Sequence, residues 1–242
     1  MNRFFTDKSN ITASTAFIIG DDVRHITKVL RMRVGDKVVL CDGLGTDYDA
    51  VIENCGNDRI TFSVTNTRPS ENESELKITL FQGLPKAGKM ELIIQKCVEL
   101  GIYEIVPVKA LRSVVKVSAK DESTKLTRYN RIAFEAAKQS QRGIIPRVLD
   151  FTTFEDADLS DFDAVIVAYE EEKNVTLKQA LSSLSEAKRI ALIIGPEGGL
   201  EEKEVASLTN RGGISVSLGK RILRTETAGM ATLAMLMYGL DG

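Results

Sequence analysis

The stretch IALIIGPEGGLEEKEVASLTNRGGISVSLGKRILRTETAGMATLAMLMYGL, residues 190–240, decides the fold. It contains two apolar runs, residues 190–194 and 214–218, and each run leads into a glycine-bearing loop and then into a helical pattern. Short apolar runs bounded by glycine are typical of buried strands. The stretch therefore predicts a strand, a loop and a helix, used twice.

The chain from residue 76 onward repeats this alternation. Three more strands are predicted at 76–82, 105–108 and 164–168. The predicted helices are 89–100, 124–142 and 176–184, together with 201–211 and 225–240, which follow the two strands above. Such alternation favours a largely parallel sheet with helices on its faces. Ligands bind beyond the carboxyl ends of the strands in these sheets, so loops 195–199 and 219–225 are the predicted ligand-binding loops.

Residues 1–70 have a different pattern. Short β-type runs separated by turn signals predict a small antiparallel barrel or sandwich. One short helix is predicted over residues 21–31, with Val23, Ile26 and Val29 or Leu30 on its apolar side. The polar residues 71–75 lack periodicity and predict a linker, which gives domains at 1–70 and 76–242.

Composition narrows the classes of protein. Three cysteines without CxxC spacing and a single histidine predict neither a disulfide framework nor a metal site. No apolar run approaches the roughly 20 residues of a membrane-spanning helix, and the N-terminus lacks the apolar region of a signal peptide. These features predict a cytoplasmic protein without a membrane partner.

Positive charge is concentrated in two tracts, although the net charge is −2. Residues 109–147 carry ten Lys or Arg against three Asp or Glu, and residues 24–37 add Arg24, Lys28, Arg31, Arg33 and Lys37. Each tract is either an ordinary solvated face or a surface that contacts phosphate groups.

The two predicted ligand-binding loops differ in chemistry. Residues 195–199, GPEGG, can turn sharply and approach a ligand closely, and Glu197 could accept a proton, bind an amino group or interact with a helix dipole. In the second loop, apolar side chains could sandwich a flat ring while Arg224, always protonated, meets an anion. Thr225 is predicted to cap the last helix. The chain lacks the P-loop, GxGxxG and GxSxG motifs.

These two loops resemble the signature of the SPOUT methyltransferases. The whole chain is similar to the RsmE-type 16S rRNA (uridine-N3)-methyltransferases, because HITKVLRMRVGD (25–36), KMELIIQKCVELGI (89–102), RSVV (112–115) and RIAFEAAKQSQR (131–142) match further motifs of that family. The resemblance implies a SPOUT-type trefoil-knotted α/β methyltransferase domain preceded by a small PUA-like β-barrel that holds RNA. It also implies a homodimer with the active site at the subunit junction.

The resemblance further implies S-adenosylmethionine as the cofactor and 16S rRNA, in the assembled small ribosomal subunit, as the partner. The residues implied to bind the cofactor are Tyr169, Ile194, Gly195, Pro196, Glu197, Gly198, Leu218, Gly219, Ile222 and Leu223. The residues implied to bind RNA are Arg24, His25, Lys28, Arg31, Arg33, Arg112, Arg131 and Arg142.

The mechanistic hypothesis is removal of the weakly acidic uridine N3 proton, followed by attack of N3 on the sulfonium methyl group. Arg224, with Arg142 as a further candidate, is expected to stabilise charge, and Glu197 and Glu226 are the candidate bases, with Glu197 preferred. Two alternatives are a ribosome assembly factor that binds RNA without catalysis and a 2′-O-ribose methyltransferase. A small-molecule methyltransferase would not need the basic tracts.

Overall fold

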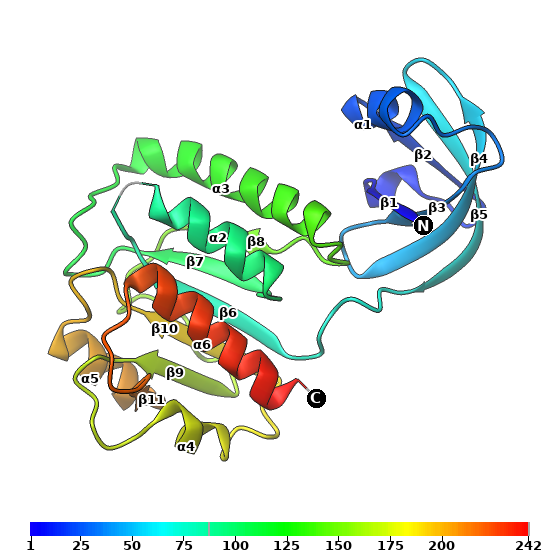
Figure 1. The fold of residues 1–242 in the computed structure, drawn as a ribbon. Coiled ribbons are helices and arrows are strands. Elements are labelled where there is room, and N and C mark those ends of the chain that lie inside the picture. Colours follow the sequence, from blue (N-terminus) through cyan, green and yellow to red (C-terminus); the bar gives the residue numbers. More distant parts are fainter. Residues whose placement is uncertain (87, 242) are drawn as a thin grey trace. The chain divides into compact units, whose positions relative to one another are not determined.

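The computed structural model describes residues 1–86 and 88–241, and these residues form two compact units (Figure 1). The first unit comprises Met1–Glu73 together with Ala137–Ile145, and the second comprises Ser74–Ala136 and the chain from Pro146 onward. Each unit has its own hydrophobic core.

The first unit is built on a five-stranded sheet in the order β1-β3-β4-β5-β2. Its strands are β1 (Asn2–Phe5), β2 (Thr15–Ile19), β3 (Lys37–Cys41), β4 (Thr46–Cys55) and β5 (Arg59–Pro69). Pairing is antiparallel except between β1 and β3, and β1 and β2 are the two edges of the sheet. The predicted small barrel is therefore present as a half-barrel.

The helix predicted over residues 21–31 is shorter and irregular. Helix α1 (Asp21–Arg24) continues into a π-helical turn, η2 (His25–Val29), and a 3-10 turn, η1 (Lys8–Asn10), lies earlier in the chain. Val23 and Ile26 are buried as predicted, but Val29 is 67% exposed and Leu30 is also exposed. The wider π turn shifts the helical spacing, which places these last two apolar residues outside the core.

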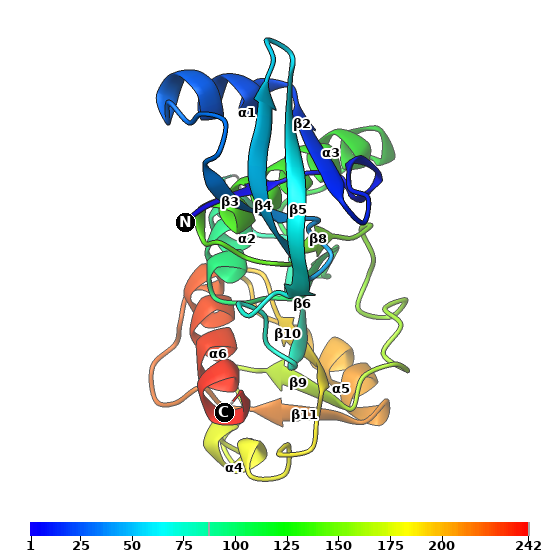
Figure 2. The ribbon, with the colours of Figure 1, turned by 90° about the vertical axis from the view of Figure 1, so that its right-hand side faces the viewer.

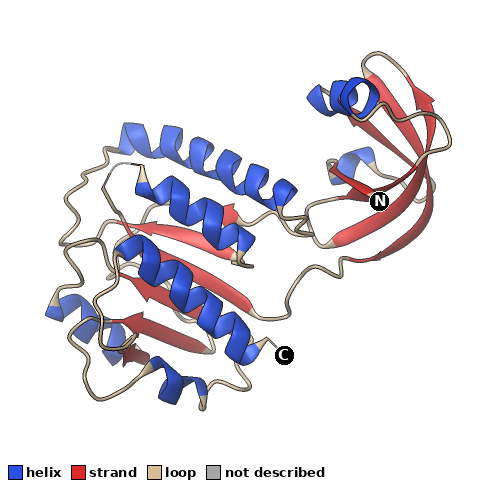
Figure 3. Cartoon of the chain, viewed as in Figure 1, coloured by secondary structure: helices blue, strands red, loops and turns tan. Residues whose placement is uncertain are grey.

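The second unit contains a six-stranded parallel sheet in the order β11-β9-β10-β6-β7-β8. Its strands are β6 (Lys77–Gly83), β7 (Glu104–Val108), β8 (Arg147–Val148), β9 (Ala164–Ala168), β10 (Arg189–Ile194) and β11 (Gly213–Val216). Its helices are α2 (Lys89–Glu99), α3 (Ala119–Gln139, whose last residues belong to the first unit), α4 (Leu177–Leu181), α5 (Glu202–Asn210) and α6 (Thr225–Leu240). The alternation predicted from the sequence is visible in Figure 3.

Helices cover both faces of the parallel sheet. Helices α2 and α6 pack side by side on one face, and α5 lies on the opposite face (Figures 1 and 2). Successive residues of the central strand β10 point to opposite faces, and Ile190 to Ile194 are all buried. Burial on both faces explains why this strand reads as a continuous apolar run.

The long helix α3 begins five residues before the predicted start. The Ser118 hydroxyl accepts a hydrogen bond from the backbone N–H of Asp121, as an N-cap does, and also donates to the Asp121 carboxylate. The first turn of α3 is too polar to show apolar periodicity, so periodicity alone places the start of the helix too late. The Ser118 cap is the sequence signal that marks the true start.

Candidate functional site

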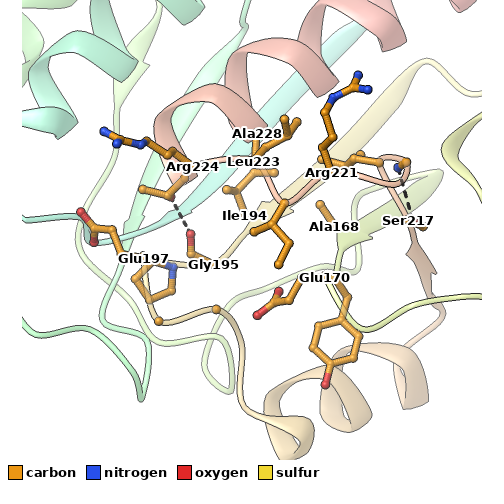
Figure 4. A pocket seen from close by; sticks show the side chains of 18 of the residues that line it. Ala168, Glu170, Ile194, Gly195, Glu197, Ser217, Arg221, Leu223, Arg224 and Ala228 are labelled. Atoms are coloured by element: carbon orange, nitrogen blue, oxygen red, sulfur yellow. Dashed lines mark hydrogen bonds between the residues drawn. The ribbon is translucent and has the colours of Figure 1, made fainter.

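Loops from the carboxyl edge of the parallel sheet enclose one pocket of about 560 Å³ in the second unit (Figure 4). The loops follow β9, β10 and β11, and the first residue of α2 adds Lys89. All ten residues predicted to bind the cofactor line it, namely Tyr169, Ile194, Gly195, Pro196, Glu197, Gly198, Leu218, Gly219, Ile222 and Leu223. The volume lies within the range of small-molecule sites, roughly 300–1,000 Å³.

The first pocket loop is held by close backbone contacts. A Cβ placed on Gly83, at the end of β6, would lie 2.6 Å from both the ring Cδ and the N of Pro196. Gly199 has a φ of +73°, a conformation that glycine adopts without strain. The glycines therefore let β6 approach the loop closely and let the chain reverse into α5.

The second pocket loop is joined to the first by Thr225. Its hydroxyl donates a 2.6 Å hydrogen bond to the Gly195 carbonyl and accepts one of 2.8 Å from Gln82 Nε2. Thr225 is the first residue of α6, and the N-cap is Arg224, which makes no side-chain cap hydrogen bond. The prediction that Thr225 caps the last helix is therefore wrong.

The apolar residues of the second loop contribute unequally. Leu218 and Leu223 are half-buried, whereas Ile222 is 86% exposed. Figure 4 shows Arg224 and Glu197 at one end of the pocket, and Arg221 and Ser217 at the other. The two labelled cations of this loop, Arg221 and Arg224, thus lie at opposite ends of the pocket, with Leu223 between them.

Lys89 connects the two carboxylates that the sequence nominates as bases. Its Nζ lies 3.0 Å from Glu197 Oε1 and 3.1 Å from Glu226 Oε2. The contact with Glu226 is an ion pair outside hydrogen-bond geometry, because the buried Oε2 has no hydrogen-bond partner among the described residues. We call Lys89, Glu197 and Glu226 the ion-pair cluster. Lys89 is not among the site residues predicted from the sequence, although its place after β6 puts it at the same edge of the sheet.

The ion-pair cluster shifts the pKa of each member. Burial acts to raise the pKa of Glu197, but hydrogen bonds from Lys89 and from backbone N–H groups outweigh burial and leave it lowered. Burial also acts to raise the pKa of Glu226, but a backbone N–H group and the positive charges of Lys89 and Arg224 outweigh burial and leave it lowered. The two carboxylates in turn raise the pKa of Lys89, Glu197 more than Glu226. Both carboxylates are therefore weaker bases than an isolated glutamate.

Arg112 lies beside the first pocket loop. Its Nε is 3.0 Å from Glu201 Oε1, and its Nη1 donates a 3.2 Å hydrogen bond to the Gly198 carbonyl. A Cβ on Gly198 would lie 3.0 Å from the Arg112 Cβ. Arg112 thus contacts the pocket wall while its side chain is exposed.

The predicted RNA-binding residues fall into exposed and buried groups. The exposed group consists of Arg24, His25, Lys28, Arg31, Arg33, Arg112 and Arg131. Five of these follow one another along α1, η2 and the segment after it, in the first unit.

Arg142 is placed differently from the expectation. It is 5% exposed, and its Nη2 lies 2.7 Å from Glu73 Oε2 within the first unit. The Glu73 Oε1 atom also accepts hydrogen bonds from the backbone of Gly143 and Ile144, at 2.6 and 3.0 Å. Burial in this network does not support the expected roles of Arg142 in RNA contact or charge stabilisation. Sequence reasoning missed Glu73 because it stands in a polar segment that reads as a linker.

Among residues 1–86 and 88–241, no cluster of three or more His, Cys, Asp or Glu side chains is arranged to hold a metal ion. No helix in the described part of the chain has the length and apolar character needed to cross a membrane.

Comparison with known families defines the class of protein. A family described as "RNA methyltransferase domain" matches residues 72–237, and one described as "RNA methyltransferase PUA domain" matches residues 18–65. The fold and the pocket are therefore those of an RNA methyltransferase with an N-terminal PUA-like domain, as the sequence predicted.

Similar proteins define the family within this class. The chain is 38% identical to ribosomal RNA small subunit methyltransferase E of Bacillus subtilis, covering 98% of this chain and 96% of that protein. The Mycobacterium tuberculosis protein of the same name is 31% identical over 95% of this chain and 88% of its own length. The crystal structure of the Neisseria gonorrhoeae protein of this name, bound to S-adenosyl methionine, is 31% identical with a TM-score of 0.84, covering 99% and 98% of the two chains. The chain belongs to the ribosomal RNA small subunit methyltransferase E family, which confirms the predicted family.

Proposed function

We propose that this protein transfers a methyl group from S-adenosylmethionine to N3 of a specific uridine in 16S rRNA, within the small ribosomal subunit. The observation that carries the proposal is the pocket in which the GPEGG loop and the loop 218–224 meet Lys89 and Glu197 of the ion-pair cluster. Such a pocket combines a binding cavity with Arg224 and Glu197 at one end and Arg221 at the other. The proposed site of action is the cytoplasm, where ribosomal subunits are assembled.

The residues of the pocket fit S-adenosylmethionine. Backbone groups of the glycine-bearing loops 195–199 and 217–220 line the cavity and can bind polar atoms of the cofactor, while Ile194, Leu218 and Leu223 supply apolar surface for its adenine ring. The sequence similarity to a protein whose structure contains this cofactor supports the same assignment. When bound, the cofactor supplies an electrophilic methyl group on a sulfonium centre.

The side chains around Arg224 and Glu197 have to orient the uracil ring and accept its N3 proton. Arg224 is proposed to stabilise negative charge that develops on the ring oxygens. Glu197 and Glu226 are the proposed proton acceptors; Glu197 lines the pocket, and both carboxylates are ion-paired with Lys89, which also lines it. Orientation contributes to rate because it replaces a random encounter by a fixed geometry.

The exposed cations of the first unit are proposed to hold the RNA. Arg24, Lys28, Arg31 and Arg33 lie on and after a short helix of the domain that matches the PUA family, and His25 lies among them. Arg112 and Arg131 are proposed to add contacts from the second unit. The protein is further proposed to act as a homodimer, as its resemblance to SPOUT methyltransferases implies.

The test is methyl transfer from labelled S-adenosylmethionine to small ribosomal subunits that lack the modification, beside free 16S rRNA. Labelled N3-methyluridine in the digested RNA is the expected product, with subunits preferred over free RNA. A methyl group on ribose would instead indicate a 2′-O-methyltransferase. Cofactor binding by calorimetry, with no transfer to either RNA, would indicate a different substrate, and absence of cofactor binding would indicate an assembly factor.

A further inference from the structure

The ion-pair cluster gathers three charged groups from separate segments of the second unit. Lys89 is the first residue of α2, Glu197 stands in the loop after β10, and Glu226 is in the first turn of α6. One ammonium group thus faces two carboxylates, at 3.0 and 3.1 Å. This arrangement holds the lysine head group more tightly than a single surface ion pair would, since each carboxylate restrains it from a different element.

The ammonium group of Lys89 is also open to a ligand. The side chain is 30% exposed and lines the pocket. An ammonium group carries three N–H donors. In residues 1–86 and 88–241 the structure gives Nζ two ion-pair partners, Glu197 Oε1 and Glu226 Oε2, so at least one of its three donors is left for a molecule in the pocket.

The electrostatic state of the cluster suits charge stabilisation. The two carboxylates raise the pKa of Lys89, so the group stays protonated and cannot act as a base. A protonated amine fixed at the pocket is suited to an anion that forms during the reaction. Uracil becomes such an anion when N3 loses its proton, because the negative charge spreads onto O2 and O4.

We propose that Lys89 is a catalytic residue that donates a hydrogen bond to a ring oxygen of the target uracil as the N3 proton leaves. This inference rests on the proposed function. In the step, the N3–H bond breaks and the proton passes to a carboxylate of the ion-pair cluster and then to water. The N3 electron pair forms the bond to the methyl carbon as the methyl–sulfur bond breaks, and that electron pair stays on sulfur. Glu197 and Glu226 position Lys89 in addition to accepting the proton.

The first test compares Lys89→Met and Lys89→Arg with the wild type. We expect Lys89→Met to lower kcat about 100- to 1,000-fold, the usual effect of removing one donor to a developing anion. KM for the ribosomal subunit and Kd for S-adenosylmethionine should stay within about threefold, because the donor acts in the transition state. Lys89→Arg keeps the charge and should retain more of the rate than Lys89→Met.

The matched control is Lys96→Met, on the same helix. Lys96 pairs with Glu99 at 2.9 Å and does not line the pocket. We expect wild-type kcat for this variant. Thermal unfolding of each variant verifies that the loss in Lys89→Met is not loss of fold.

A second test changes the acidity of the substrate. Fluorine at C5 withdraws electrons and makes the N3–H of uracil more acidic, so the anion needs less help. On small subunits assembled from 16S RNA that contains 5-fluorouridine, the ratio of the Lys89→Met kcat to the wild-type kcat should rise at least tenfold. A variant that only misplaces the cofactor would gain nothing from this change.

The outcomes separate this inference from the proposed function. A wild-type product methylated on ribose overturns both. N3-methyluridine from the wild type, with Lys89→Met within about threefold of its kcat, overturns the role of Lys89 alone. A loss in Lys89→Met that is matched by weaker cofactor binding, with no recovery on fluorinated RNA, also overturns it.

Discussion

The hydroxyl of Thr225 donates a 2.6 Å hydrogen bond to the carbonyl of Gly195, which joins the start of α6 to the loop after β10. The same hydroxyl accepts from Gln82, a fully buried residue of β6. One side chain therefore connects β6, the loop after β10 and the start of α6. This link fixes the two pocket loops relative to each other.

Replacing Thr225 by Val should loosen the two loops without changing the shape of the side chain. Loss of the hydroxyl leaves the Gly195 carbonyl and the Gln82 amide without this partner, at a cost of about 1–3 kcal/mol in the free energy of unfolding. We also expect about tenfold weaker binding of S-adenosylmethionine, which corresponds to roughly 1.4 kcal/mol. Urea denaturation and calorimetry measure the two effects. Thr227→Val, at an exposed position of the same helix, is the control and should change neither.

Gly83→Ala should distort the GPEGG loop, because Gly83 at the end of β6 lies against it. The new Cβ would lie 2.6 Å from Pro196 N and 2.9 Å from the carbonyl carbon of Gly195, so backbone has to move. We expect a loss of stability of about 1–3 kcal/mol and cofactor affinity reduced more than tenfold.

Gly212→Ala provides the comparison for Gly83→Ala. Gly212 has a φ of +89° and open space where a Cβ would stand, so alanine there costs only backbone strain, roughly 1–2 kcal/mol. Its cofactor affinity should equal that of the wild type. Equal affinities in the two variants would contradict the proposed contact between β6 and the loop.

Glu73→Gln should destabilise the first unit in a pH-dependent way. Burial acts to raise the pKa of Glu73, but hydrogen bonding and charge from Arg142 outweigh it and leave the pKa lowered. A lowered folded-state pKa contributes stability above the ordinary glutamate value of 4.5, and this contribution is lost as the pH falls through the folded-state pKa. Leaving Arg142 buried without its carboxylate partner should cost about 3–5 kcal/mol at neutral pH.

Denaturation of the wild type and Glu73→Gln at pH 7 and at successively lower pH measures this difference. The gap between their unfolding free energies should shrink below pH 4.5. Glu71→Gln is the control, because the Glu71 side chain is 83% exposed and its pair with Arg68 is a surface contact. That variant should stay within about 1 kcal/mol of the wild type at every pH. A gap for Glu73→Gln that widens in acid would refute the assignment.

The double substitution Arg24→Gln and Lys28→Gln should weaken RNA binding through loss of phosphate contacts. Two lost contacts to single-stranded RNA should lower the slope of log affinity against log salt by about 1.4. Binding of 16S RNA measured over a salt series tests this, and cofactor affinity should not change. Lys203→Gln, at an exposed position on α5, is the control for general loss of charge. An unchanged slope in the double variant would remove this surface from the RNA-binding site.

The sequence was a good guide to the parallel half of the fold and to the pocket loops. Helix α6 has the predicted bounds, and α2 begins at the predicted residue and ends one residue before the predicted end. These predictions succeeded because strong apolar periodicity records which side of an element faces the core. The trefoil knot and the homodimer stay predictions that the resemblance implies.

The sequence was a weaker guide where local polarity hides a tertiary contact. Strands β1 and β2 are four and five residues long, and neither shows a pattern that identifies its partner. Glu73 lies in a polar segment whose composition indicates a linker, yet it pairs with Arg142, 69 residues away. Composition cannot reveal such pairs, because a buried charge is stable only with a partner that folding brings to it.

The amino-acid sequence by itself determined the alternation of strands and helices, the two glycine-bearing loops and the family to which they belong, since these depend on local periodicity and on short contiguous motifs. Only the tertiary structure decided what the charged side chains do. It paired Glu197 and Glu226 with Lys89, placed Arg142 in the interior and gave Thr225 the Gly195 carbonyl instead of a helix cap. The physical reason is that the strength and the chemistry of a charge or a hydroxyl depend on the groups within a few ångströms of it, and those groups come from distant parts of the chain.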